Sequence, residues 1–86
     1  MHLWVNSIVE GELAPSALAP EDLAAAGLGN LLRLHKLAGR DVRPSQVNGE
    51  PAFEVRHDDG AIHALHWLSP DNEGAARVTA RGVTQP

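Results

Sequence analysis

The residues best suited to chemistry are histidines, three of which fall within ten residues of one another. The five histidines are His2, His35, His57, His63 and His66. Imidazole binds transition metals and exchanges protons near neutral pH, so a metal site is the first possibility to test. On a strand, His63 and His66 point to opposite faces, whereas His57 and His63 share a face if a three-residue turn separates their strands. Two histidines are too few for a closed zinc site, and the nearby acids lie in the turn, so we expect no metal and no cofactor.

His35 falls within the apolar arc of a predicted helix. A histidine there is a tuned general base, a buried pH switch or a core-edge residue held by one hydrogen bond. No nucleophile or paired acid stands near it in the sequence. The serines lack a Gly-x-Ser-x-Gly context, and Gly27-Leu28-Gly29 lacks the third glycine of a dinucleotide site. We therefore expect no catalytic residues and no enzymatic activity.

Basic side chains gather in one segment of an acidic chain, which has a net charge of -4 and a pI of about 5.6. Within residues 31–43 they are Arg33, Lys36, Arg40 and Arg43. Asp41 is the one acid in that segment. Such a stripe suits an acidic protein surface or nucleic acid, or is simply a solvated helix face. Because no aromatic or glycine-rich element for reading bases accompanies the stripe, nucleic acid is the weaker partner.

Most of the stripe belongs to a predicted helix. Pro20-Glu21-Asp22 is a strong helix start, because proline suits the first turn and carboxylates there complement the helix dipole. The helical pattern runs to Ala38, and Gly39 is the expected stop. Gly27 and Gly29 weaken the middle, so one long helix and two short helices broken near residues 27–30 are alternatives.

This helix has more apolar surface than one small sheet can cover. At about 100° per residue one broad face is apolar, and Leu23 and Leu37 widen it. That face comprises Ala24, Leu28, Leu31, Leu32, Leu34 and Ala38. We expect the excess to remain exposed and to bind a partner, in a homodimer or a tight hetero-complex, with Leu34 or Leu37 at the contact.

These features favour a non-catalytic protein-binding module, of the kind found among inhibitors, antitoxins, accessory subunits and small phage proteins. The predicted partner-binding residues are Arg33, Leu34, Lys36, Leu37, Arg40 and Trp67. The first alternative is a nucleic-acid-associated regulator that uses the basic helix face. The second alternative is a small metal or ligand binder that uses the histidines of the hairpin.

The remaining segments predict a small antiparallel sheet. Residues 1–9 alternate as a strand, and two further strands, 52–57 and 61–68, flank Asp58-Asp59-Gly60, the strongest hairpin turn in the chain. Residues 75–80 predict the third strand of a meander. Residues 43–46 predict a loop, and residues 14–19 predict a loop or a short turn of helix. The expected fold class is α+β. Its sheet combines the N-terminal strand with the C-terminal three-stranded meander, and one or two helices pack on one face.

We expect residues 1–82 to form one globular domain and residues 83–86 to form a frayed tail. The chain has no cysteine, so no disulfide can reinforce it. No leader peptide is evident, and no apolar run approaches the roughly 20 residues needed to cross a bilayer. A cytoplasmic location is therefore expected. A domain this small has a thin margin of stability, which also favours association.

Overall fold

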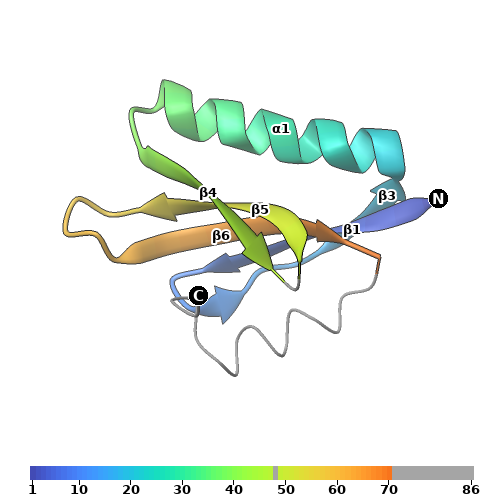
Figure 1. Cartoon of the computed structure of the whole chain (residues 1–86), viewed down its shortest axis with the longest axis horizontal. Helices are drawn as coiled ribbons and strands as arrows, with labels where there is room; N and C mark the ends of the chain where they lie inside the picture. The colour runs from blue at the N-terminus through green and yellow to red at the C-terminus, as the bar shows by residue number, and fades with distance from the viewer. Residues whose placement is uncertain (48, 71–86) are drawn as a thin grey trace.

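The computed structural model describes residues 1–47 and 49–70. Within them, six strands form one antiparallel sheet, and a helix packs on one of its faces (Figure 1). The elements in chain order are β1 (His2–Val9), β2 (Glu12–Leu13), β3 (Ala17–Pro20), α1 (Glu21–Leu37), β4 (Asp41–Val47), β5 (Glu50–Arg56) and β6 (Ile62–Ser69). The strand order is β2-β1-β6-β5-β4, and β3 also pairs with β1. The predicted α+β class and antiparallel sheet are confirmed.

The centre of the sheet joins the two ends of the described chain. β1 pairs with β6 in a register that runs from Trp4 opposite Ser69 to Val9 opposite Ala64. β6 continues into β5 through the predicted hairpin, and β5 pairs with β4. The meander of the described residues is therefore β4-β5-β6. The predicted strand at residues 75–80 and the predicted tail at residues 83–86 lie outside the described residues.

One segment predicted as a loop is a strand, and a second is a strand in its latter half. Residues 43–46 belong to β4, where Pro44 lies opposite Phe53 and Gln46 lies opposite Pro51. Proline cannot donate to a sheet ladder, but β4 is an edge strand of the described sheet, where a missing donor is tolerated. Residues 14–19 overlap β3, whose Ala17 lies opposite Val5.

The helix is continuous, which resolves the alternative left open by Gly27 and Gly29. Pro20 occupies the N-cap position, and Glu21 and Asp22 lie in the first turn. The predicted start is thus confirmed to within one residue. At the other end Gly39 has a φ of 76°, the left-handed conformation that glycine adopts most readily, and its N–H donates to the carbonyl of Lys36.

Each face of the sheet has its own apolar cluster. On the helix side, the buried residues Phe53, Val55 and Ala64 contact leucines of α1. Those leucines are Leu28, Leu31 and Leu32. Alternate residues of the strands point to the opposite face, where the second cluster consists of Ile8, Val47, Leu65 and Trp67. Within the described residues, no helix is long and apolar enough to cross a membrane.

Candidate functional site

The outward face of α1 exposes three large leucines. Leu23, Leu34 and Leu37 have 62%, 60% and 78% of their surface accessible. At about 100° per residue these leucines, with Ala26 and Asn30 between them, fall within about 80° of the helix circumference. We call these five residues the outer stripe. The predicted apolar face was too broad, because Leu34 belongs to this stripe and not to the side that packs on the sheet.

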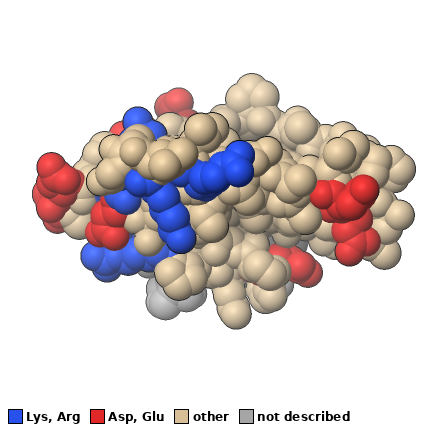
Figure 2. All heavy atoms as spheres, turned by 90° about the horizontal axis from the view of Figure 1, so that it is seen from above, with Lys and Arg blue, Asp and Glu red and all other residues tan. Residues whose placement is uncertain are grey.

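Basic side chains lie beside the outer stripe. Figure 2 shows Lys and Arg gathered toward the C-terminal end of α1, whereas acidic side chains lie at both ends of this view. Several of the cations have local partners. Arg33 donates to Asn30 at 2.8 Å, and the Arg40 guanidinium lies 2.9 Å from Nδ1 of His35. Arg40 follows α1 in the chain, and its contact with His35 keeps its charge beside the C-terminal end of the helix.

One residue of the basic segment and one predicted contact residue do not belong to the face of α1. Arg43, from the basic segment, lies on β4 and forms an ion pair of 3.0 Å with Asp41. The hydrogen bond to this carboxylate raises the pKa of Arg43 above its usual value. Trp67, which the sequence placed at a partner contact, is 1% exposed and belongs to the second core cluster. Its indole is therefore not available to a partner in this structure.

An apolar groove of about 480 Å³ runs beside the helix. Its helix side includes Leu28, Gly29 and Leu32, and its sheet side includes Pro44 and Phe53. Lys36 also lines the groove and, at about 100° per residue, lies between the groove and the outer stripe. The groove is therefore a second apolar surface, on the side of α1 that faces the edge of the sheet.

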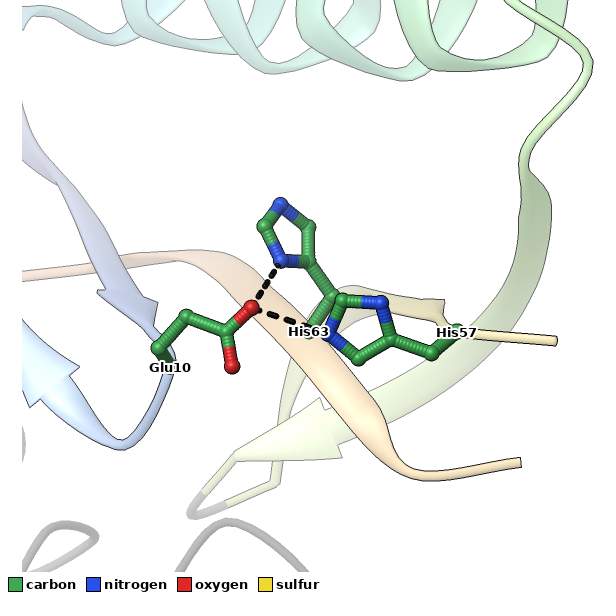
Figure 3. A group of neighbouring side chains, drawn as sticks. All are labelled: Glu10, His57 and His63. Atoms are coloured by element: carbon green, nitrogen blue, oxygen red, sulfur yellow. Dashed lines mark hydrogen bonds and ion pairs between the residues drawn. The ribbon is translucent and has the colours of Figure 1, made fainter. Parts of the chain in front are cut away.

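A second candidate site joins two hairpins through three titratable side chains. Glu10 follows β1, whereas His57 and His63 stand on either side of the turn between β5 and β6. Figure 3 shows the carboxylate of Glu10 reaching toward both imidazoles. Its Oε1 lies 2.8 Å from Nε2 of His57 and 2.7 Å from Nδ1 of His63. The three ligand atoms all lie within 4.8 Å of one another.

The hairpin turn explains why the two histidines meet. His57 donates its N–H to the carbonyl of Ala61 and accepts at its own carbonyl from Gly60, whose φ is 89°. This is the three-residue turn that the sequence predicted, with glycine at the left-handed position. The two imidazole centroids lie 4.9 Å apart.

A register shift in the sheet also contributes to the second site. Val55 pairs with Ala64 and Arg56 pairs with Ile62, so His63 is an extra residue on β6. Such a bulge disturbs strict alternation and re-aims the side chain that it carries. Glu10 has a φ of 52°, an uncommon conformation for a residue other than glycine. Both the acid and one histidine are thus presented by irregular backbone.

The charge of Glu10 is stabilised by its neighbours. Hydrogen bonds from His63 and then His57 lower the pKa of the carboxyl, which favours the carboxylate. Side-chain exposure is 59% for Glu10, 46% for His57 and 29% for His63. The cluster is therefore open to water and to small solutes.

Two further histidines lie between the sheet and the helix. The ring of His66 lies 5.5 Å from that of His35 and 5.0 Å from that of Phe53, measured between centroids. Burial, followed by the charges of His35 and His63, lowers the pKa of His66 to about 4. Burial and the charge of Arg40 also lower the pKa of His35. His66 is therefore neutral at physiological pH and serves as a core side chain.

The sequence paired His57 with His63 but did not identify Glu10. The only acids considered were those of the turn, whereas Glu10 is 47 residues from His57 along the chain. No local pattern carries that information, since it depends on how β1 is placed next to β6. Comparison with known proteins supplies no further guide: no family model, no curated protein and no solved structure matches this chain.

Proposed function

We propose that this chain is a protein-binding module that binds a second copy of itself through the outer stripe of α1. The observation that carries the proposal is the exposure of Leu23, Leu34 and Leu37 along one line of the helix. Aligned leucines on a helix surface are typical of helix-to-helix contacts. A domain of this size also gains stability by burying such surface in a dimer.

The stripe is self-complementary when two copies of α1 run antiparallel. With Asn30 at the twofold axis, Leu23 faces Leu37 of the second copy, and Ala26 faces Leu34. The two Asn30 amides then face each other and can exchange hydrogen bonds. A twofold contact uses the same patch on both subunits, which is the commonest form of homodimer.

The charges on the helix fit the same arrangement. Asp22 lies in the first turn and Lys36 in the last turn, on the same flank of the outer stripe. In an antiparallel pair Asp22 of each copy approaches Lys36 of the other. Attraction between these opposite charges favours the antiparallel register over the parallel one. A module of this kind acts by covering a surface, as inhibitors, antitoxins and accessory subunits do.

Sedimentation equilibrium over a range of concentrations tests the proposal. We expect a reversible dimer for the wild-type chain and monomers for Leu34→Glu and Leu37→Glu. Burying a carboxylate among leucines costs about 3 kcal/mol or more, which corresponds to at least about a hundredfold weaker association. Leu13→Glu is the matched control, because Leu13 is 47% exposed on β2, away from α1. It should leave the dimer intact.

A wild-type chain that stays monomeric at high micromolar concentration would overturn self-association and leave the stripe to a different protein. Equal weakening by Leu13→Glu and Leu34→Glu would show that the contact lies elsewhere. Circular dichroism of each variant establishes that it is folded. Leu34 and Leu37 are exposed, so their substitution removes little core packing.

A further inference from the structure

The cluster of Glu10, His57 and His63 has the chemistry of a metal site. It offers two imidazole nitrogens and one carboxylate oxygen, the donors that bind zinc and related divalent ions in proteins. Three protein ligands leave further coordination positions for water, as in open metal sites. All three side chains reach solvent, so an ion has a path to the cluster.

The present distances suit an ion after a small adjustment. Glu10 Oε1 is 2.7 and 2.8 Å from the two nitrogens, which are hydrogen-bond lengths. Ligand atoms around a tetrahedral zinc lie about 3.3 Å apart, because each bond to the metal is about 2.0 to 2.2 Å. A movement of about half an ångström at Glu10 Oε1 would therefore give this oxygen the zinc spacing from both nitrogens.

Backbone hydrogen bonds hold the three ligand residues in place. Glu10 N–H donates to the carbonyl of His63 at 2.7 Å, which fixes the acid next to the bulged histidine. His57 is fixed by its two turn hydrogen bonds to Ala61 and Gly60. His57 and His63 also line a polar pocket of about 350 Å³.

We propose that Glu10, His57 and His63 bind one divalent transition-metal ion of the zinc type per chain. Nitrogen donors select such an ion over calcium or magnesium, which prefer oxygen. The binding replaces the two hydrogen bonds of Glu10 with bonds to the metal and releases any proton held on the ligating nitrogens. This site lies at the hairpin turns and is separate from the outer stripe of α1.

Isothermal titration of the chain with Zn²⁺ tests the site. The protein carries no affinity tag of histidines and is first dialysed against a chelator. We expect saturable binding of one ion per chain, reversed by excess chelator. We expect Zn²⁺ affinity to fall at least about tenfold in each of three variants: Glu10→Gln, His57→Gln and His63→Gln. Loss of a group that only hydrogen-bonds to a metal ligand already weakens metal binding by that much.

Matched controls separate this site from general binding by surface groups. Glu12→Gln changes the neighbouring carboxylate of the same hairpin, and His2→Gln removes another exposed histidine. Both should bind Zn²⁺ as the wild type does. Histidine ring nitrogen shifts in the wild-type NMR spectrum identify the ligands without any substitution, so the test does not depend on the folding of a variant.

The proposal fails if Zn²⁺ shows no saturable binding at millimolar concentration. It also fails if binding is saturable but insensitive to Glu10→Gln and His63→Gln, or if the nitrogen shifts appear on His35 or His66. In those cases Glu10 is only a carboxylate that ties two hairpins together. Calcium serves as the last comparison, and binding of Ca²⁺ as tight as that of Zn²⁺ would contradict the assignment to nitrogen donors.

Discussion

Ser7 and His66 share a hydrogen bond of 2.7 Å between adjacent strands, although 59 residues separate them in the sequence. The bond uses Nδ1 of the histidine. The other ring nitrogen, Nε2, is buried without a hydrogen-bond partner among the described residues. A neutral imidazole with one unpaired nitrogen is tolerated in the core, but a charged one is strongly disfavoured.

The free energy of unfolding should therefore decrease at acid pH, because His66 is protonated more readily in the unfolded chain. Its pKa in the folded chain is about 4, compared with about 6.5 when unfolded. The unfolded chain binds this proton first, so stability falls as pH drops from about 6.5 to about 4. Allowing for partial screening by solvent, His66 should account for about 2 to 3 kcal/mol. Urea unfolding at pH 7, 5.5 and 4.5 measures the loss.

The double variant Ser7→Ala/His66→Phe isolates this effect. It replaces both hydrogen-bonding groups with apolar ones of similar shape, a change that can be nearly neutral at pH 7. We expect the loss of stability between pH 6.5 and pH 4 to shrink, whereas His2→Gln should leave it unchanged. An identical pH profile in the double variant would show that His66 is not the titrating group.

Gly60→Val should destabilise the fold through backbone strain alone. Gly60 has a φ of 89°, and a Cβ built there meets no atom within 4 Å. A β-branched residue in this conformation costs about 1 kcal/mol or more. Gly27→Ala is the matched control, since Gly27 also has open space but lies in the helix. That variant should be more stable by up to about 1 kcal/mol. Equal thermal stability of Gly60→Val and wild type would contradict the turn assignment.

A charge exchange across the proposed dimer tests its register. Asp22→Lys and Lys36→Glu should each weaken the homodimer, because each puts like charges opposite one another. When the two variants are mixed at low salt, the mixed dimer should form with roughly tenfold higher affinity than either variant homodimer, because both contacts are then attractive. Native mass spectrometry measures the mixture. No preference for the mixed dimer would rule out the antiparallel register, and high salt should suppress a true preference.

Asn6 should be among the most costly polar residues to remove. It is fully buried, donates to Ser69 Oγ at 2.8 Å and accepts from Ser16 Oγ at 3.0 Å. Asn6→Ala should cost about 2 kcal/mol, because the removed amide leaves space and lost hydrogen bonds in the core. Ser16→Ala removes one of these bonds and should cost about half as much. Unfolding in urea compares them, and similar losses would show that the Ser69 bond contributes little.

The helix start and the hairpin turn could be predicted from the sequence, because each depends on the conformational preferences of a few neighbouring residues. The start of α1 at Pro20 and the turn before Gly60 follow from backbone preferences of a few residues. β4 was wrongly predicted as a loop because Pro44 signals a break, and only the position of β4 at an edge of the described sheet makes that proline acceptable. Leu34 was grouped on one broad apolar face with the leucines that pack on the sheet, because helical periodicity defines a face but not how wide a sheet lies beneath it.

The candidate sites divide in the same way. Exposure of Leu37 follows from an excess of leucine that any single layer would leave uncovered. The cluster at Glu10 required the pairing of β1 with β6, which joins residues 53 positions apart in the case of His63. Pairing of strands so far apart in the chain depends on the arrangement of the whole sheet, so no short stretch of the sequence predicts it.

Pro44 has a consequence for how copies of this chain can assemble. A sheet edge is normally a template on which further strands add without limit, which is the route to fibrils. A strand from another chain that approached β4 would find no N–H donor at Pro44. β4 also carries the paired charges of Asp41 and Arg43. Growth along that edge is therefore discouraged. The proposed twofold contact through α1, by contrast, buries the surface that forms it and ends at two copies, so an exposed apolar face of this kind would not lead to open-ended assembly.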